Sequence, residues 1–253
     1  MKKTALKKHT TGTAPKVKYR RILLKLSGEV LRSKDGQNCI DEGTLAEMAA
    51  QIKAVRALGV QVGVVIGGGN IFRGLKGQSR GFGRAEGDNM GMLATMINSL
   101  ALESALNAAG VPARTLAARA MPAMAELFTF RRAIEWLEAG TVVVLGGGSG
   151  APFFTTDSAA ALRAAEIGAE ILLKATKVDG IYTADPFRDP TATKFDRLTY
   201  SEALSRRLKV MDSTAFSMCM DNHIPILVFD FFKRGELLKV VRGQKAGTLV
   251  SGN

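Results

Sequence analysis

Short apolar runs alternate with longer stretches of helical periodicity along most of this chain. Residues 22–24, 62–66 and 141–145 are too short for helices and rich in branched side chains, so they predict buried strands. Glycine follows each of these runs within four residues. Open α/β folds bind their ligands at the carboxyl ends of parallel strands, so glycine at three strand ends predicts one ligand-binding edge.

Apolar positions recur at helical spacing between and after these strands. Thr44 and Glu47 form a capping-box pattern that predicts a helix start, and the apolar stripe runs to Leu58 before Gly59 ends it. Asp88, an N-cap residue type, is predicted to start a long helix that ends near residue 109. The other predicted helices are 131–138, 158–167, 200–208, 213–220 and 235–241, the other strands are 111–116, 170–174, 225–230 and 248–250, the loops are 32–43 and 75–87, and 117–130 has no clear pattern.

The alternation of strands and helices predicts the fold class, a three-layer α/β/α sandwich around a mainly parallel sheet. The first two strands and the helix between them form a β-α-β unit, which predicts a parallel pair with a right-handed crossover. A chain of 253 residues with 46% hydrophobic content can bury such a core. The apolar runs are too short to span a bilayer, so no membrane association is expected.

The net charge of +12 is concentrated at the N-terminus. Residues 1–21 hold eight Lys or Arg and no acidic residue, which leaves 27 basic and 23 acidic residues in the remainder. Residues 1–18 have no periodicity and predict a basic, disordered tail. A solvated extension is the preferred interpretation of this tail, and nucleic-acid binding is not expected. The remaining excess of +4 suits anionic substrates.

Cysteine and histidine are too scarce to suggest a disulfide framework or a histidine-based metal site. Cys39 and Cys219 are the two cysteines, and His9 and His223 are the two histidines. The basic N-terminus is not followed by the apolar segment of a secretory signal. Together these features predict a cytoplasmic protein with reduced thiols.

Two predicted strands carry a lysine at or near their ends, Lys25 and Lys174. A buried ammonium group is costly unless an anion meets it, so these lysines indicate a site for phosphate. The Walker A loop, the protein-kinase loops, the Rossmann fingerprint and the nucleophile elbow are all absent from the sequence. Strand-end lysines, glycine loops and Arg73 after one of those loops instead favour phosphoryl transfer.

Five motifs together resemble the bacterial uridylate (UMP) kinases of the amino acid kinase superfamily, over roughly residues 19–250. They begin at Lys25 (KLSGE), Gly67 (GGGNIFRG), Gly87 (GDNMGMLAT), Pro152 (PFFTTDSAA) and Leu173 (LKATKVDGIYTADP). The resemblance implies transfer of the γ-phosphoryl group of ATP to UMP, giving UDP in pyrimidine nucleotide biosynthesis. It also implies a single domain over residues 19–253, with the UMP site in its N-terminal part and the ATP site in its C-terminal part.

The resemblance implies a role for each matched residue, with Asp88 as an acceptor for a ribose hydroxyl. Asp157 and Asp212 would order the lysines and the metal. The metal would be Mg²⁺, bound mainly through the nucleotide phosphates without a protein metal site. The implied catalytic residues are Lys25, Arg73, Asp157 and Lys174; the ATP-binding residues are Lys25, Leu26, Ser27, Gly28, Gly69, Arg73, Thr176, Tyr182 and Asp185; the UMP-binding residues are Gly68, Asp88, Ser149, Gly150, Ala151, Pro152, Phe153, Phe154, Thr155 and Thr156.

The resemblance further implies a homohexamer and regulation by GTP and UTP, with residues 33–38 in the path of a GTP effect. Ala151 departs from the family pattern, where asparagine is common, so one polar contact to UMP is in question. Two alternatives remain: a carboxylate kinase of the same superfamily, acting on acetylglutamate or aspartate, and a non-catalytic nucleotide-binding storage or sensor protein. A carboxylate kinase would need an arginine-rich acyl pocket, and the retained Lys25, Arg73, Asp157 and Lys174 argue against lost catalysis.

Overall fold

One nine-stranded sheet organises residues 17–73, 81–206, 208 and 211–252, which the computed structural model describes. The strands are β1 (Arg21–Leu26), β2 (Gln61–Ile66), β3 (Ala113–Ala117), β4 (Glu126–Leu127), β5 (Val142–Gly146), β6 (Ile171–Thr176), β7 (Arg197–Thr199), β8 (Ile226–Asp230) and β9 (Thr248–Ser251). They lie in the order β4-β3-β5-β2-β1-β6-β8-β9-β7. Among the described strands, only β8 and β9 pair antiparallel.

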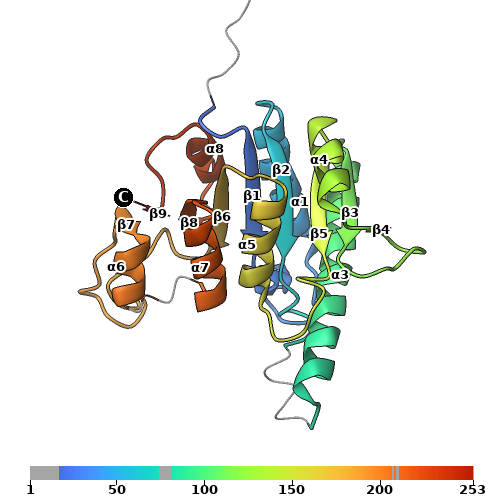
Figure 1. The fold of residues 1–253 in the computed structure, drawn as a ribbon, viewed down its shortest axis with the longest axis horizontal. Coiled ribbons are helices and arrows are strands. Elements are labelled where there is room, and N and C mark those ends of the chain that lie inside the picture. The colour runs from blue at the N-terminus through green and yellow to red at the C-terminus, as the bar shows by residue number, and fades with distance from the viewer. Residues whose placement is uncertain (1–16, 74–80, 207, 209–210, 253) are drawn as a thin grey trace, which may run out of the picture.

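Helices cover both faces of this sheet, which confirms the predicted three-layer sandwich (Figure 1). The helices are α1 (Glu42–Arg56), α3 (Arg84–Ala108), α4 (Phe130–Glu138), α5 (Thr156–Glu166), α6 (Tyr200–Ser205), α7 (Ser213–Asp221) and α8 (Glu236–Val241), with a short 3₁₀ helix, η1, at Gly28–Leu31. Figure 1 shows α5 and α7 in front of the sheet and α1 behind it.

The pleat of β1 divides its side chains between two cores. Ile22, Leu24 and Leu26 face the core closed by α1, α3 and α8, whereas Leu23 faces the core closed by α4, α5 and α7. Side chains alternate between the two faces of a strand, so Lys25 lies on the same face as Leu23. The period of two therefore directs the Lys25 ammonium group toward α5.

The register of the sheet places a second lysine beside the first. In the parallel pair β1 and β6, Leu23 lies opposite Leu172 and Lys25 lies opposite Lys174. Residues directly opposite in neighbouring strands point to the same face and lie close together. Both ammonium groups therefore project from the sheet side by side, on the face that α5 covers.

The three strands predicted to end in glycine are neighbours in the sheet. β5, β2 and β1 are adjacent in this order and parallel to one another. The predicted β-α-β unit is also confirmed, since β1 and β2 pair in parallel with α1 between them in the chain. Parallel alignment brings the three glycine-rich strand ends to one edge, as the sequence predicted.

The prediction of a capping box at Thr44 is wrong. Helix α1 begins at Glu42, and its N-cap is Asp41, whose Oδ1 accepts hydrogen bonds from the Thr44 backbone N–H (2.7 Å) and hydroxyl (2.8 Å). Thr44 is also an N-cap residue type, and the sequence pattern did not distinguish between the two.

The start predicted for the long helix is also wrong. Helix α3 begins at Arg84, with Gly83 as its N-cap, so the predicted loop at 75–87 ends four residues earlier than expected. Asp88 lies one turn inside the helix, where its side chain pairs with Arg84 rather than capping the backbone. The glycines around Arg84 concealed the first helical turn, because glycine disfavours helix.

Other differences are confined to the ends of elements and to very short elements. β6 continues to Thr176 instead of ending at Lys174, and α6 ends at Ser205. The strands β4 and β7 and the helix η1 have two to four residues each, which is too short for a periodic signal. Most of the predicted tail and part of the loop at 75–87 lie outside the described residues. No helix within the described ranges has the length and apolarity needed to cross a membrane.

Candidate active site

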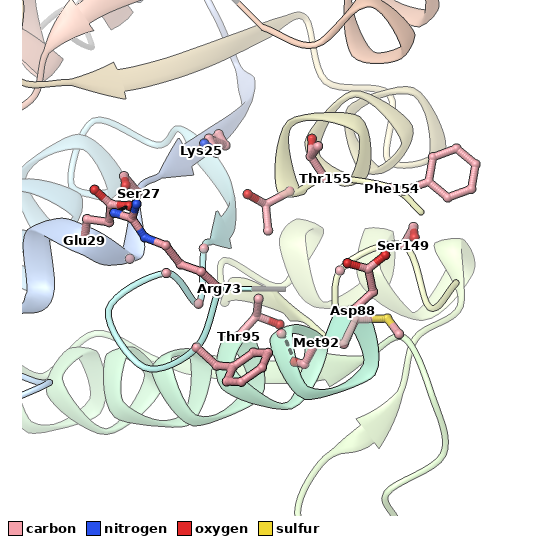
Figure 2. Close-up of a pocket in the computed structure, with 18 of the residues that line it drawn as sticks. Lys25, Ser27, Glu29, Arg73, Asp88, Met92, Thr95, Ser149, Phe154 and Thr155 are labelled. Carbon is pink, nitrogen blue, oxygen red and sulfur yellow. Dashed lines mark hydrogen bonds and ion pairs between the residues drawn. The ribbon is translucent and has the colours of Figure 1, made fainter. Parts of the chain in front are cut away.

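The glycine loops at the ends of β1, β2 and β5 surround a cavity of about 500 Å³. Figure 2 shows Lys25, Ser27 and Glu29 on one side of it, and Asp88 and Phe154 on the opposite side. Helix α3 and the N-terminal turn of α5 complete the wall. The predicted residues that line this cavity are Lys25, Ser27, Gly28, Gly68, Gly69, Arg73, Asp88, Ser149, Ala151, Phe154, Thr155 and Thr156.

A second cavity, of about 610 Å³, opens beside the end of β6. It is lined by Lys174 and by the three residues predicted to hold adenine and ribose, Thr176, Tyr182 and Asp185. The Tyr182 hydroxyl donates a hydrogen bond to Asp179 Oδ1 (2.5 Å), which orients the aromatic ring. This bond, together with the neighbouring Lys194, holds the pKa of Asp179 below its ordinary value, so that carboxylate stays ionised at neutral pH.

Asp157 connects the two cavities through paired lysines. Lys25 Nζ lies 2.7 Å from Asp157 Oδ1, and Lys174 Nζ lies 2.7 Å from Asp157 Oδ2. The three side chains are only 11–15% exposed. Lys25 lines the first cavity and Lys174 the second, so one carboxylate holds an ammonium group at each.

The charges in this triad set the pKa values of its members. Burial acts to raise the pKa of Asp157, but the two lysine ammonium groups outweigh burial and hold the pKa below its ordinary value. Burial, aided by the nearby charge of Lys25, lowers the pKa of Lys174, and Asp157 opposes that shift. The Asp157 carboxylate is therefore ionised at neutral pH.

Glycine is required where the strand-end loops meet each other and α3. A Cβ on Gly28 would lie 2.0 Å from the carbonyl oxygen of Gly67. A Cβ on Gly68 would lie 2.7 Å from the Cβ of Ala94 and 2.9 Å from the Thr95 nitrogen, both on α3. These approaches leave no room for a side chain. Backbone atoms therefore form the cavity wall at these positions, which allows a ligand to approach them closely.

Arg73 reaches the cavity from the loop that follows β2 and pairs there with Glu29 of η1. Both side chains are nearly half exposed, so solvent screens their ion pair and an incoming anion can compete with Glu29. The sequence prediction did not include Glu29. Glu29 lies in the KLSGE motif, but a negatively charged side chain is not expected next to a phosphate.

On the opposite wall, Asp88 joins α3 to the loop before α5. Its Oδ2 accepts hydrogen bonds from Arg84 Nε (2.7 Å) and from the Phe153 backbone N–H (2.8 Å). Arg84 also lies over the Phe153 ring, 5.5 Å from its centroid. Arg84 lines the cavity and was missed, because its segment was predicted to be a loop.

The departure at Ala151 has a local structural counterpart. The Ser149 hydroxyl donates to the carbonyl oxygen of Ala151 (2.9 Å) and accepts from its backbone N–H (3.2 Å). This small closed turn fixes the loop without a polar side chain at 151. The Ser149 hydroxyl both donates and accepts a hydrogen bond within this turn.

Asp212 is the N-cap residue of α7, and its carboxylate also binds the N-terminal turn of α5. Its carboxylate accepts from the Ser158 hydroxyl (2.9 Å), from the Thr155 hydroxyl and from the Ala215 backbone N–H (2.9 Å). It also contributes to the charge around Lys174, where it acts to raise the pKa of that lysine. Its direct contacts are therefore with the helix that carries Asp157, rather than with the lysines.

Four predicted binding residues do not line either cavity. Leu26 is buried in the core, and its carbonyl oxygen accepts from the Gly67 N–H (3.0 Å). The Phe153 side chain is 65% exposed, and Phe153 reaches the site through its backbone bond to Asp88 and the contact of its ring with Arg84. Gly150 and Pro152 lie in the same loop but are not among the residues that line the first cavity.

A metal site made by protein side chains alone has no basis in the described ranges, where no three His, Cys, Asp or Glu side chains cluster suitably. The central carboxylate of Asp157 already binds two ammonium groups.

Replacing Asp157 by asparagine should destabilise the protein, because two ammonium groups would remain side by side without a carboxylate. We expect a loss of about 3 kcal/mol at pH 7, typical of a broken buried ion pair. The pKa of Asp157 in the folded state is below its ordinary value of 3.8, so its contribution is present above pH 3.8 and is lost as the pH falls below it. Urea unfolding at pH 7 and at pH 3 should show the two proteins converging in stability at low pH. An equal difference at both pH values would contradict the assignment.

Known proteins that resemble this chain identify its family. The model of the amino acid kinase family matches residues 20–230. The uridylate kinase of Bacteroides thetaiotaomicron is 59% identical over 233 residues, covering 92% of this chain and 98% of that protein. The uridylate kinase of Bradyrhizobium diazoefficiens is 54% identical over 234 residues, with the same coverage of the two chains.

Solved structures agree with the sequence relatives. The UMP kinase from Bacillus anthracis superposes with a TM-score of 0.90 at 36% identity, covering 93% of this chain and 97% of that one. The uridylate kinase from Archaeoglobus fulgidus superposes with a TM-score of 0.68 at 30% identity, covering 91% and 99%. Because the family model spans most of the chain and the sequence relatives are more than half identical to it, this chain belongs to the amino acid kinase family.

Proposed function

We propose that this chain is a nucleoside monophosphate kinase that transfers the γ-phosphoryl group of ATP to UMP, giving ADP and UDP for pyrimidine nucleotide biosynthesis. The observation that carries the proposal is the Lys25–Asp157–Lys174 triad, which presents one ammonium group to each of two neighbouring cavities. The names of the relatives, uridylate kinase and UMP kinase, supply the acceptor.

In the proposed reaction an oxygen of the UMP phosphate forms a bond to the γ-phosphorus of ATP, and the bond from that phosphorus to the β,γ-bridging oxygen breaks. A phosphate monoester is largely doubly ionised at neutral pH, because its second pKa is near 6. The attacking oxygen therefore carries no proton to remove, and no general base is needed. The protein has to align two anions and neutralise the charge on the transferring group.

Lys25 and Lys174 supply that neutralisation. Each ammonium is held in place by Asp157, so neither has to reorganise as charge develops on the transferring phosphoryl group. Lys25 would contact the γ-phosphoryl group, and Lys174 the leaving phosphate. Arg73 would leave Glu29 to bind phosphate oxygens, since that exposed pair is the weaker of its two possible interactions.

Backbone groups would complete the phosphate path. Gly28, Gly68 and Gly69 line the first cavity with main-chain atoms, and Ser27 adds a hydroxyl. The N-terminus of α5, capped by Thr155, carries the partial positive charge of a helix start and favours an anion. Asp157 also lies in this first turn, but its carboxylate is paired with the ammonium groups of the two lysines.

The first cavity would take UMP and the second the nucleoside part of ATP. Asp88 would accept from a ribose hydroxyl of UMP, with residues 149–156 around its phosphate and base. Tyr182 would place its ring against adenine, while Thr176 and Asp185 hold adenine and ribose. This division agrees with the predicted assignment of the UMP site to the N-terminal part of the domain and the ATP site to its C-terminal part.

ATP-dependent phosphoryl transfer usually needs a divalent metal, and we propose Mg²⁺, carried mainly by the nucleotide phosphates. When bound, it would neutralise charge on the β- and γ-phosphoryl oxygens. The engagement of Asp157 by two lysines supports this arrangement. The homohexamer, the regulation by GTP and UTP and the cytoplasmic location stay predictions from the family resemblance.

A direct test measures ADP release with UMP, CMP, dTMP, acetylglutamate and aspartate in parallel, each with ATP and Mg²⁺. We expect UMP to give the highest kcat/KM, because the proposed acceptor side is built around Asp88 and a nucleotide-sized cavity. Preferred turnover of acetylglutamate or aspartate would establish the carboxylate kinase alternative. ATP binding without turnover of any acceptor would favour the storage or sensor alternative.

Replacing Lys25 by alanine should lower kcat for UMP phosphorylation by about 10²- to 10³-fold, because a preorganised charge is lost from the transition state. Folding should survive, since Asp157 keeps Lys174 as its partner and the remaining pair is neutral. Steady-state kinetics and thermal unfolding would measure the two effects separately. Lys245→Ala, at a side chain 79% exposed, is the matched control. Turnover like that of the wild type in Lys25→Ala would remove this lysine from the mechanism.

Replacing Asp88 by asparagine should mainly raise the KM for UMP, by about 10-fold, while kcat changes little. The substitution keeps the shape of the side chain but weakens a contact made equally in the ground state and the transition state. The KM for ATP should stay constant, because Asp88 lines the first cavity and not the second. An unchanged KM for UMP would reassign this residue to a purely structural role with Arg84 and Phe153.

A further inference from the structure

The face of α3 that packs on the sheet is unusually polar. Thr95, Asn98 and Ser99 are 3%, 0% and 0% exposed, and their spacing of three and four residues places them on one side of the helix. Burying polar groups is unfavourable unless they are hydrogen-bonded, so an ordinary core would carry apolar residues here. The positions of their partners suggest why polar residues are retained.

Asn98 binds the glycine loop that follows β2. Its amide nitrogen donates to the Gly67 carbonyl oxygen (2.6 Å) and to Asn70 Oδ1 (2.7 Å). Asn70, itself 1% exposed, donates back to Asn98 Oδ1 (3.1 Å) and to the Cys39 carbonyl oxygen (2.8 Å). This reciprocal amide pair holds both ends of the segment that contains Gly68 and Gly69.

Thr95 binds the glycine loop that follows β5. Its hydroxyl accepts from the Gly147 backbone N–H (2.9 Å) and donates to the Met92 carbonyl oxygen (2.7 Å), as the dashed line in Figure 2 marks. Gly147 has φ of +81° and is followed by Gly148 at +61°, so the backbone turns sharply here. The Thr95 bond fixes the start of the loop that leads to Ser149.

One helix therefore holds two loops that come from adjacent strands and line the same cavity. One and two turns earlier, α3 carries Met92 and Asp88 in the cavity wall. The loop after β2 also touches the loop after β1, since Gly67 and Gly28 are in close contact. A shift of the Gly67 loop would consequently reach the end of β1, close to Lys25.

We propose that Thr95 and Asn98 are positioning residues that fix the spacing of the two glycine loops, and thereby the alignment of the acceptor phosphate with the transferring phosphoryl group. This inference rests on the proposed function. Packing alone would be served by apolar side chains, whereas only hydrogen-bonding groups can set the position of a backbone carbonyl in one loop and an N–H in the other. Misplacement of reacting groups by 1 Å can cost about 10²-fold in rate.

The test compares side chains that differ in hydrogen bonding but little in size. Thr95→Val removes the hydroxyl and keeps the shape, whereas Thr95→Ser keeps the hydroxyl. Asn98→Asp keeps the shape but replaces the donor to Gly67 with a second acceptor. Ser99→Ala is the control on the same face, because the Ser99 hydroxyl donates to Thr95 O within the helix and binds neither loop. Each variant is measured with UMP and ATP for kcat, both KM values and thermal unfolding.

We expect kcat to fall by about 10- to 100-fold in Thr95→Val and in Asn98→Asp. Thr95→Ser and Ser99→Ala should stay within about threefold of the wild type. Thr95→Val should also raise the KM for UMP, because its loop reaches Ser149, and leave the KM for ATP unchanged. A protein whose kcat falls in Thr95→Val and recovers in Thr95→Ser supports positioning through the hydroxyl.

Folded variants with lower thermal stability but unchanged kcat and KM would overturn the inference, since that result describes a structural role alone. If Thr95→Val does not fold, the kcat of Asn98→Asp tests the same inference through the loop that follows β2. Failure of the proposed function has a different signature, because the wild-type protein itself would then fail to phosphorylate UMP.

Discussion

The structure depends on one carboxylate that holds two ammonium groups side by side. Lys25 and Lys174 are neighbours because β1 and β6 pair in parallel in a fixed register, and without a counterion their charges would repel. Asp157 at the start of α5 offsets that repulsion, because each of its carboxylate oxygens lies 2.7 Å from one ammonium group. The same interaction therefore stabilises the contact between α5 and the sheet and, in the proposed function, prepares the site for an anion.

The main chain provides the second constraint. Parallel strands β1, β2 and β5 bring three glycine-rich loops to one edge, and the loops approach so closely that Gly28 and Gly68 cannot carry a side chain. Close packing of this kind lets backbone groups face the ligand, but it also makes loop spacing sensitive to small shifts. Helix α3 restrains two of these loops through hydrogen bonds made by Asn98 and Thr95.

The two cavities differ in how they are built. The first is bounded by loops held by α3 and α5, with Asp88 joining α3 to the loop before α5. The second is formed by turns after β6, where Tyr182 is held by Asp179 and the lining residue Asp185 is exposed. Loops held closely by α3 and α5 agree with the proposed reaction, in which the acceptor phosphate has to meet the γ-phosphoryl group in one alignment.

The sequence by itself determined the alternation of elements and the glycine-rich edge, with Lys25, Arg73 and Lys174 beside it, because strand periodicity and glycine clusters are local signals. The candidate roles of Asp88 and Asp157 came from the resemblance of whole motifs to a family. Tertiary structure decided that Asp157 lies between the two lysines, since that contact joins residues 132 and 17 positions apart along the chain. It also decided the roles of Glu29, Arg84, Thr95 and Asn98. The partners of Glu29, Thr95 and Asn98 are distant in the chain and are known only once α3 and η1 pack against the glycine loops, and Arg84 was hidden because the first turn of α3 was predicted to be a loop.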